Sequence, residues 1–403
     1  MPDADTKVLA VSCHCGAATH TFNIPISALP LPTHLCSCDI SRRISGSLLT
    51  SYINITHPTA SALAPLKPDT SALTAYHSSD ILKRWFCTSC GTHMYLEYYS
   101  DGHFEAATGT LTCESTDGIV EYKSCMWIGD TKDGGASHFI SQIDGRELPR
   151  WTEEAGESEQ VARDWQSPSR AQTQQQEQKD EEEQPRKPIY AHCHCTGVEF
   201  YIQHPTPASK TAASPFADLL IPHYLNRSAN PSNTPWWLPN SESRYLAGTC
   251  TCHSCRRSLG FDITFWAFIP EANIFLDAEL STPFPAGGVW GTMKTYASST
   301  GVMRSFCGTC GANVFWSGSR ETHGREGLVD VAVGLLDAGN GARAEEVLGW
   351  WTGRVSFEEE AVNKGLVGAL ERGLREWAKG KGGGDGVAKF REGGFEGMVE
   401  KGE

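Results

Sequence analysis

The sequence has no long apolar run, no basic block and no apolar leader. None of its hydrophobic stretches approaches the ~20 consecutive apolar residues of a bilayer-spanning helix, so we expect no membrane segment. The first nine residues include Asp3, Asp5 and Lys7 and therefore lack the apolar core of a secretory signal. The formal net charge of −14 disfavours a nucleic-acid partner, which usually requires a basic face. These absences predict a cytoplasmic protein, with the nucleus not excluded.

The length of the chain predicts more than one domain. A chain of 403 residues is too long for one ordinary hydrophobic core, and two domains are the natural expectation. Hydrophobic residues make up 39% of the sequence and aromatic residues 10%, which is enough to form real cores.

Cysteine is the residue type that carries most of the information. Of the 15 cysteines, only Cys113 and Cys125 stand outside tight C-x-C or C-x-x-C groups, and we expect these two to be small buried hydrophobes. In a reducing compartment disulfides are disfavoured, so clustered cysteines indicate metal binding or redox chemistry.

The cysteine groups recur in the same order in both halves of the chain, which indicates a tandem repeat. The matching pairs, each given as first half and second half, are Cys13-His14-Cys15 and Cys193-His194-Cys195; Cys36-Ser37-Cys38 and Cys250-Thr251-Cys252-His253-Ser254-Cys255; Phe86-Cys87-Thr88-Ser89-Cys90-Gly91 and Phe306-Cys307-Gly308-Thr309-Cys310-Gly311; and Thr108-Gly109-Thr110-Leu111 and Val333-Gly334-Leu335-Leu336.

The repeat and the composition predict the domain boundaries. We expect a first copy at 8–151, a Gln- and Glu-rich flexible linker at 152–187, a second copy at 188–379 and a frayed Gly-rich tail at 380–403. Within the second copy, a Pro-, Ser- and Asn-rich insertion covers about 205–243.

Local patterns predict a mainly β protein with short peripheral helices. Short apolar or alternating runs at 191–202, 261–269 and 328–336 are typical of strands. Residues 362–379 place Val362, Leu366, Ala369, Leu370, Leu374 and Trp377 at helical spacing, although three glycines weaken that prediction.

The outer cysteines of each copy suit a structural zinc site. In an extended strand a C-x-C pair points both thiolates to one side, and a C-x-x-C-Gly turn supplies two more. Four sulfurs complete the closed tetrahedron of structural zinc. The predicted sets are Cys13, Cys15, Cys87 and Cys90, and Cys193, Cys195, Cys307 and Cys310. Packed core thiols, redox pairs and iron in place of zinc are the alternatives.

The middle cysteines differ between the copies. Cys250, Cys252 and Cys255 supply three thiolates, and three protein ligands with an open fourth position are typical of catalytic zinc. The fourth ligand can be water, a substrate thiol or another residue, and a trio that only braces a loop is the structural alternative. In the first copy Ser41 stands at the position of Cys255, so the site at Cys36 and Cys38 is expected to be weak or absent.

Two neighbouring side chains could replace the missing metal ligand in the first copy. Asp39 and His34 carry groups that can ligate a metal and lie close to Cys36 and Cys38 in the sequence. Any catalysis is nevertheless expected in the second copy.

The order C-x-C, C-x-C-x-x-C, F-C-x-x-C-G and G-x-L resembles the glutathione-dependent formaldehyde-activating enzyme family, also called the centromere protein V-like domain. The resemblance covers about 8–151 and 188–360. It implies a β-tent fold in each copy, Zn²⁺ on the outer four cysteines and a second Zn²⁺ on the middle trio. It also implies carbon–sulfur lyase chemistry on an adduct of glutathione and formaldehyde.

Two further residues are candidates for substrate binding in that reaction. Arg256 and Arg257 follow the trio and can grip the carboxylates of glutathione or another small thiol, with structural ion pairs as the alternative. The competing function is a non-catalytic zinc scaffold that binds another protein or, as the weaker alternative, a nucleic acid. The incomplete first copy, the insertion and the acidic linker favour it.

Overall fold

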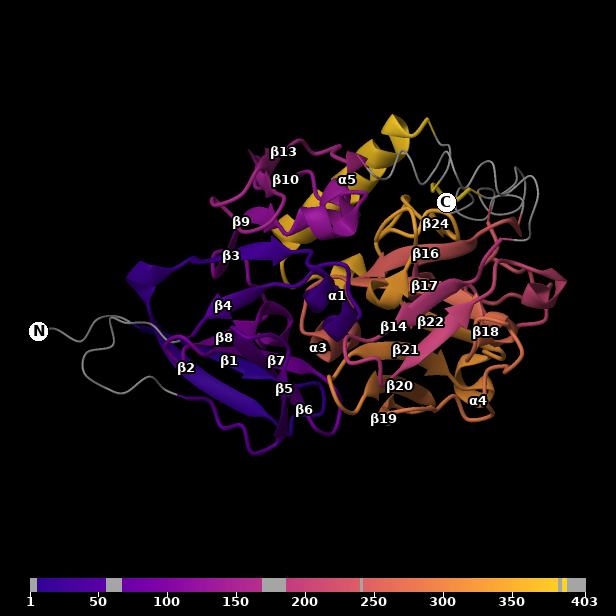
Figure 1. Ribbon diagram of the computed structural model, residues 1–403, viewed down its shortest axis with the longest axis horizontal. Helices are drawn as coiled ribbons and strands as arrows, with labels where there is room; N and C mark the ends of the chain where they lie inside the picture. Colours follow the sequence, from indigo (N-terminus) through magenta and orange to yellow (C-terminus); the bar gives the residue numbers. More distant parts are fainter. Residues whose placement is uncertain (1–5, 56–66, 169–185, 240–241, 383–385, 390–403) are drawn as a thin grey trace, which may run out of the picture.

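The computed structural model describes residues 6–55, 67–168, 186–239, 242–382 and 386–389, and it is mainly β, as the sequence predicts. The two halves of the chain lie side by side, and α1 (Asp39–Ser45) and α3 (His253–Leu259) lie where they meet (Figure 1). Within the described residues, every β pairing joins strands of the same half. None of the helices in this part of the chain combines the length and apolarity needed to cross a bilayer.

The first half contains a five-stranded antiparallel sheet, a four-stranded sheet and two hairpins. The five-stranded sheet has the order β4 (Tyr52–Asn54), β8 (Phe104–Ala107), β7 (His93–Tyr98), β6 (Leu82–Cys87), β5 (Leu73–His77). The four-stranded sheet has the order β13 (Gln160–Val161), β12 (Arg150–Trp151), β9 (Val120–Met126), β3 (Leu31–Cys36). The hairpins are β1 (Thr6–Ser12) with β2 (Thr19–Pro25), and β10 (Gln142–Ile143) with β11 (Arg146–Glu147).

The second half has a similar arrangement, but its described strands all belong to two sheets. Its large sheet has the order β19 (Met293–Ser299), β20 (Val302–Cys307), β21 (Asn313–Gly318), β22 (Leu328–Ala332), β17 (Thr264–Pro270), β16 (Tyr245–Cys250), β24 (Leu348–Trp350). A smaller sheet has the order β18 (Ile274–Phe275), β15 (Glu199–Ile202), β14 (Ile189–His192), β23 (Leu336–Asp337). The other α-helices of the described residues are α4 (Arg320–His323) and α5 (Lys364–Gly380). The runs predicted as single strands at 191–202 and 328–336 are each interrupted, the first by the turn between β14 and β15 and the second by a 3-10 helix at Val333–Leu335.

Glycines at equivalent positions let the two halves approach closely. Gly91 and Gly311 have φ of +75° and +81°, and a Cβ on either would lie 2.5 Å from the ring of Phe306 or Phe86 in the other half. Each C-x-x-C-Gly turn therefore receives a phenylalanine from the opposite copy. The buried apolar side chains of both halves form one continuous core.

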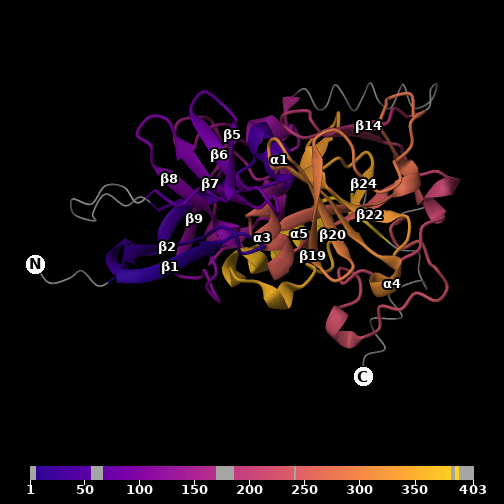
Figure 2. The same ribbon diagram turned by 90° about the horizontal axis from the view of Figure 1, so that it is seen from below.

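The predicted helix at 362–379 is confirmed as α5, and it packs on the other half of the molecule. The helix buries Leu366, Leu370 and Trp377 and lies beside β10 of the first half (Figure 1). Seen from below, the two halves of the chain again lie side by side (Figure 2). A Cβ on Gly373 would lie 2.0 Å from the Phe139 carbonyl oxygen. This glycine weakens the helix as an isolated element, but its missing side chain permits the packing.

Ordered structure extends beyond the predicted boundary at residue 151. Residues 152–168, which we expected to open a flexible linker, include β13 and the Arg163–Glu376 ion pair with α5. The prediction from composition fails here because Val161 and Trp165 pack against the hydrophobic core, most of which lies outside the segment. Of the predicted linker, 169–185 lies outside the described residues.

The insertion and part of the tail also belong to the folded structure. Trp236 and Trp237 in the insertion are 1% and 0% exposed, and Trp237 donates to the Ser209 carbonyl oxygen at 2.8 Å. In the tail, Val387 forms a parallel bridge with Trp350 at the end of the large sheet. The described parts of the tail, 380–382 and 386–389, are therefore not frayed as expected. Residues 383–385 and 390–403 lie outside the description.

Candidate metal centres

The outer cysteines of each copy converge as predicted from the repeat. We call Cys13, Cys15, Cys87 and Cys90 the first cluster, and Cys193, Cys195, Cys307 and Cys310 the second cluster; within each, all four sulfurs lie within 4.8 Å of one another. All of these cysteines are free thiols.

The C-x-C pairs lie in turns, not in strands as we expected. The first pair follows β1, and the turn closes with a bond of 2.9 Å from the Cys13 amide to the Ala18 carbonyl oxygen. The Ala18 amide also donates to Cys13 Sγ at 3.3 Å. Val198 makes the same contact with Cys193 Sγ in the second copy, at 3.4 Å. A turn that aims amide N–H groups at a sulfur stabilises a thiolate, which a strand pairing on both sides cannot do.

The sulfur spacing in both clusters fits a tetrahedral divalent ion. A zinc–sulfur bond of about 2.3 Å places neighbouring sulfurs of a regular tetrahedron about 3.8 Å apart. The sulfurs of Cys13 and Cys15 lie 3.5 Å apart, and those of Cys15 and Cys87 lie 3.6 Å apart. In the second cluster, Cys195 lies 3.5 Å from both Cys193 and Cys307. The donor set is therefore suited to hold a closed structural metal site in each half.

The middle trio also comes together in the second copy. We call Cys250, Cys252 and Cys255 the third cluster; their sulfurs lie within 4.8 Å of one another, and no fourth ligand joins them among the described residues. Cys250 ends β16, and Cys252 caps the N-terminus of α3 by accepting from the Cys255 amide at 3.3 Å. The strand end and the helix cap together fix the three sulfurs.

A buried arginine that we did not predict lies beside the third cluster. Arg304 on β20 is 3% exposed, and its Nη2 donates to Cys255 Sγ at 3.3 Å and to Ser254 Oγ at 3.0 Å. Hydrogen bonds from the Cys250 and Cys252 thiols, together with the charge of Arg304, hold the pKa of Cys255 well below its ordinary range, although burial opposes this. Arg84 stands at the matching position of the first copy, so the repeat itself contained the signal.

The first copy lacks a third ligand at the corresponding position. Ser41 Oγ lies 3.1 Å from Cys38 Sγ and 3.7 Å from Cys36 Sγ, and it accepts from Arg84 Nη2 at 3.1 Å. Within the described residues, Cys36 and Cys38 belong to no group of three close ligands. The arrangement around Ser41 otherwise copies the one around Cys255.

The two side chains that could replace the missing ligand in the first copy, His34 and Asp39, have other partners. His34 pairs with Ser124 at 2.8 Å, and Asp39 forms an ion pair with Arg42. Neither belongs to a group of three close ligands with Cys36 and Cys38 in the described part of the chain.

The arginines considered for substrate binding contact the first copy. Arg256 is 3% exposed, and its Nη1 donates to the carbonyl oxygens of Gly109 and Leu111, each at 2.9 Å. Arg257 donates to the carbonyl oxygen of Cys13 at 2.7 Å. Both guanidinium groups therefore join the two copies.

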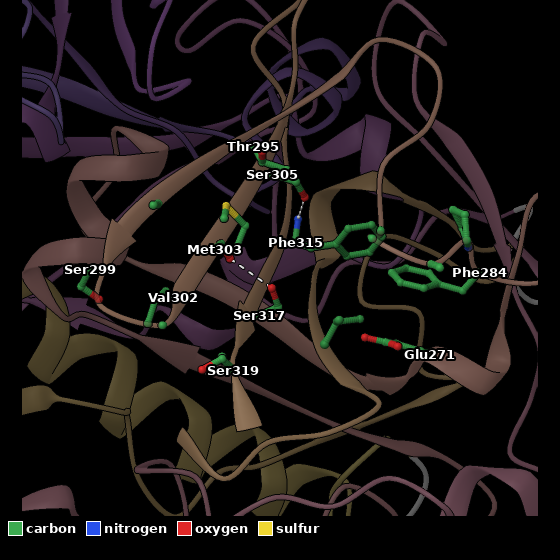
Figure 3. Close-up of a pocket in the computed structure, with 18 residues that line it drawn as sticks. Glu271, Phe284, Thr295, Ser299, Val302, Met303, Ser305, Phe315, Ser317 and Ser319 are labelled. Atoms are coloured by element: carbon green, nitrogen blue, oxygen red, sulfur yellow. Dashed lines mark hydrogen bonds between the residues drawn. The ribbon is translucent and has the colours of Figure 1, made fainter. Parts of the chain in front are cut away.

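A cavity of about 640 Å³ opens at the third cluster. All three of its cysteines line the cavity, together with Arg304 and several aromatic side chains. A second cavity of about 650 Å³ lies against β19, β20 and β21, where Phe284, Phe315 and Met303 form part of its wall (Figure 3). Glu271 is the one ionisable side chain that lines this second cavity, and no cysteine lines it. The third cluster thus has adjoining space for a ligand together with metal-ligating groups.

Comparison with known proteins agrees with the repeat. The model of the family described as "Glutathione-dependent formaldehyde-activating enzyme" matches residues 8–122 and again residues 240–354. No curated protein and no solved structure matches the chain significantly. Because the two matches together span more than half of the chain and the cysteine clusters recur in each half, this protein belongs to the glutathione-dependent formaldehyde-activating enzyme family.

Proposed function

We propose that the second copy is a zinc-dependent carbon–sulfur lyase of the glutathione–aldehyde type, with its chemistry at the third cluster. The observation that carries the proposal is a set of three thiolates, one ligand short of a tetrahedron, that lines a cavity of about 640 Å³. The first and second clusters are structural zinc sites in this proposal, since each is closed by four sulfurs.

The reaction forms or breaks one carbon–sulfur bond. A thiol adds to an aldehyde carbon, and the proton of the thiol ends on the new hydroxyl oxygen; the lyase direction is the reverse. When bound, zinc supplies an electrophile that lowers the pKa of a substrate thiol at the open position.

The side chains around the trio support this chemistry. Within the described residues, Nε and Nη1 of Arg304 are buried without a hydrogen-bond partner, so its positive charge beside Cys255 is available to stabilise an oxygen that gains negative charge in the cavity. Asp330 also lines the cavity, and burial raises its pKa to about 6 against the opposing charge of Arg325. Asp330 can therefore hold or release a proton near neutral pH.

Replacement of Arg304 tests the proposal. We expect the zinc-loaded protein to accelerate exchange between glutathione, formaldehyde and their adduct, measured by NMR exchange spectroscopy. Arg304→Gln should lower the catalysed rate about 10- to 100-fold, the value of a charge-assisted hydrogen bond in a buried site. Arg84→Gln in the first copy is the matched control and should leave the rate unchanged.

Two outcomes would count against an enzyme. If the wild-type protein gives the same exchange rate as buffer, the non-catalytic zinc scaffold replaces the lyase as the better reading. If both arginine variants lose the same activity, the effect is on folding and not on the third cluster.

A further inference from the structure

The insertion of the second copy builds one wall of the cavity at the third cluster. Phe216, Leu219 and Trp236 from the insertion line it. A Cβ on Gly248 of β16 would lie 2.2 Å from Leu219 Cδ2, so the insertion packs directly on the strand that ends at Cys250. Trp236 meets Phe268 edge to face at 4.9 Å between ring centroids. The insertion is thus a fixed part of the site.

The rest of the wall is also rich in aromatic side chains. Trp266, Phe268, Trp316 and Phe357 line the cavity from the large sheet and from the loop after β24. Of these four side chains, Trp316 and Phe357 are half-buried and the other two are buried. An aromatic cavity of this size is typical of a site for an apolar small molecule.

The charges that line the cavity are almost all paired. Arg325 forms an ion pair with Asp330 and lies over the Trp316 ring at 5.1 Å from its centroid. Asp218 is paired with Arg354 at 3.3 Å. Arg304 donates to Cys255 through Nη2, and its Nε and Nη1 make no hydrogen bond among the described residues. The cavity therefore matches a ligand with an apolar body and a single centre of negative charge.

We propose that the third cluster processes best an adduct with an aromatic or branched aliphatic body, and so prefers a bulky apolar aldehyde over formaldehyde. This inference rests on the proposed function. Formaldehyde contributes a single carbon to its adduct and would leave the aromatic walls without a partner. An apolar body would gain favourable burial against them.

The test compares two thiols on the full-length protein loaded with Co²⁺. In phenylmethanethiol the ring stands as many bonds from sulfur as it does in the adduct of an aromatic aldehyde, and 2-mercaptoethanol is the probe without a ring. The thiol-dependent change in the cobalt absorption spectrum reports binding at the third cluster, because the other clusters are closed by four sulfurs. We expect phenylmethanethiol to bind about tenfold more tightly or better.

Two tryptophan variants distinguish thiol binding in the cavity from general hydrophobic binding elsewhere. Trp316→Ala should remove most of the preference, and Trp290→Ala, which removes an equally large half-buried side chain outside the cavity, should retain it. Equal affinity for both thiols in the wild type would overturn the apolar-substrate proposal while leaving the lyase proposal standing. If neither thiol changes the spectrum, both proposals fail.

A second inference comes from contacts between the copies. His14 lies between two ligands of the first cluster, and its Nδ1 is 3.0 Å from the Tyr296 hydroxyl of the second copy. Its Nε2 is 2.9 Å from Ser254 Oγ on α3. Ser254 in turn accepts from Arg304, which also donates to Cys255. A continuous hydrogen-bonded chain thus runs from the first cluster to the third.

The directions of these hydrogen bonds are consistent with one another. A guanidinium group can only donate, so Ser254 Oγ accepts from Arg304 and can donate its own proton to His14 Nε2. A neutral imidazole ring has one accepting nitrogen, which suits the place of His14 Nε2 in this arrangement.

The pseudo-equivalent histidine supplies an internal comparison. His194 in the second copy lies 2.7 Å from the hydroxyl of Tyr76 in the first, which repeats the pairing of His14 with Tyr296. Ile40 occupies the position that matches Ser254, and an aliphatic side chain cannot continue the chain of hydrogen bonds. The connection to a metal-ligating trio is therefore particular to His14.

We infer that His14 is a positioning residue through which the first copy orients Arg304 and Cys255 in the second. His14→Ala removes two side-chain hydrogen bonds between the copies and His194→Ala removes one, so both should lower the melting temperature, His14→Ala by more. Only His14→Ala should alter the thiol-dependent cobalt spectrum and weaken 2-mercaptoethanol binding, by about fivefold or more, as expected for one buried hydrogen bond. His14→Gln, which keeps an acceptor, should restore part of the affinity. Equal spectra in the two alanine variants would overturn the inference.

Discussion

Cys255→Ser should remove one metal ion from each chain, and Ser41→Cys should add one. The wild-type protein is expected to bind about three zinc ions, two in closed clusters and one at the trio. Metal analysis by mass spectrometry should therefore give about two ions for Cys255→Ser and about four for Ser41→Cys. The first variant should also lose the catalysed exchange reaction, since the open metal site is lost with the third thiolate.

The geometry of the first copy explains why one substitution should suffice. Ser41 Oγ already lies 3.1 Å and 3.7 Å from the sulfurs of Cys38 and Cys36, near the spacing of about 3.8 Å between the ligands of a zinc ion. Arg84 contacts Ser41 as Arg304 contacts Cys255. The serine hydroxyl is a poor ligand at neutral pH, whereas a cysteine there would complete a trio.

Circular dichroism supplies the control for both variants. Each should keep the wild-type spectrum, because the first and second clusters remain intact. A third ion retained by Cys255→Ser would show that the ligand set of the third cluster is wrong. A Ser41→Cys protein without a fourth ion would show that the first copy lacks more than a thiolate.

Loss of one ligand from the second cluster should be the most destabilising change in the protein. The apparent binding free energy of structural zinc is about 10–16 kcal/mol, comparable with the whole stability of a domain at about 5–15 kcal/mol. Cys310→Ser should therefore prevent stable folding of the second copy. Because the two copies share one core, thermal unfolding of the first copy should also shift to lower temperature.

Cys125→Ala is the matched control for that experiment. Cys125 is 0% exposed and belongs to no cluster, so its replacement should cost only about 1 kcal/mol through a small cavity. A strong chelator should lower the melting temperature of the wild type and of Cys125→Ala alike. A Cys310→Ser protein that melts at the wild-type temperature with full metal content would remove the structural role from the second cluster.

The positions where sequence reasoning fell short share a physical cause. The linker and the tail were judged by their own composition, yet β13 and Val387 are ordered by partners elsewhere in the chain. Likewise, Gly373 reads as a helix breaker until Phe139 of the other copy occupies the space beside it. Arg304 went unnoticed because a single arginine in a strand has no local pattern that marks it as a partner of Cys255.

The repeat, the mainly β fold and the membership of the two four-cysteine clusters could all be predicted from the residues alone. The clusters follow from spacing, because thiolates at C-x-C and C-x-x-C intervals have few ways to converge. How the copies depend on one another could be seen only in the folded molecule. The contacts of His14 with Ser254 and of Arg256 with Gly109 join groups far apart in the chain, and such pairings follow from how two folded surfaces pack. The cavity likewise could not be predicted from the sequence, because its aromatic walls come from segments that meet only after folding.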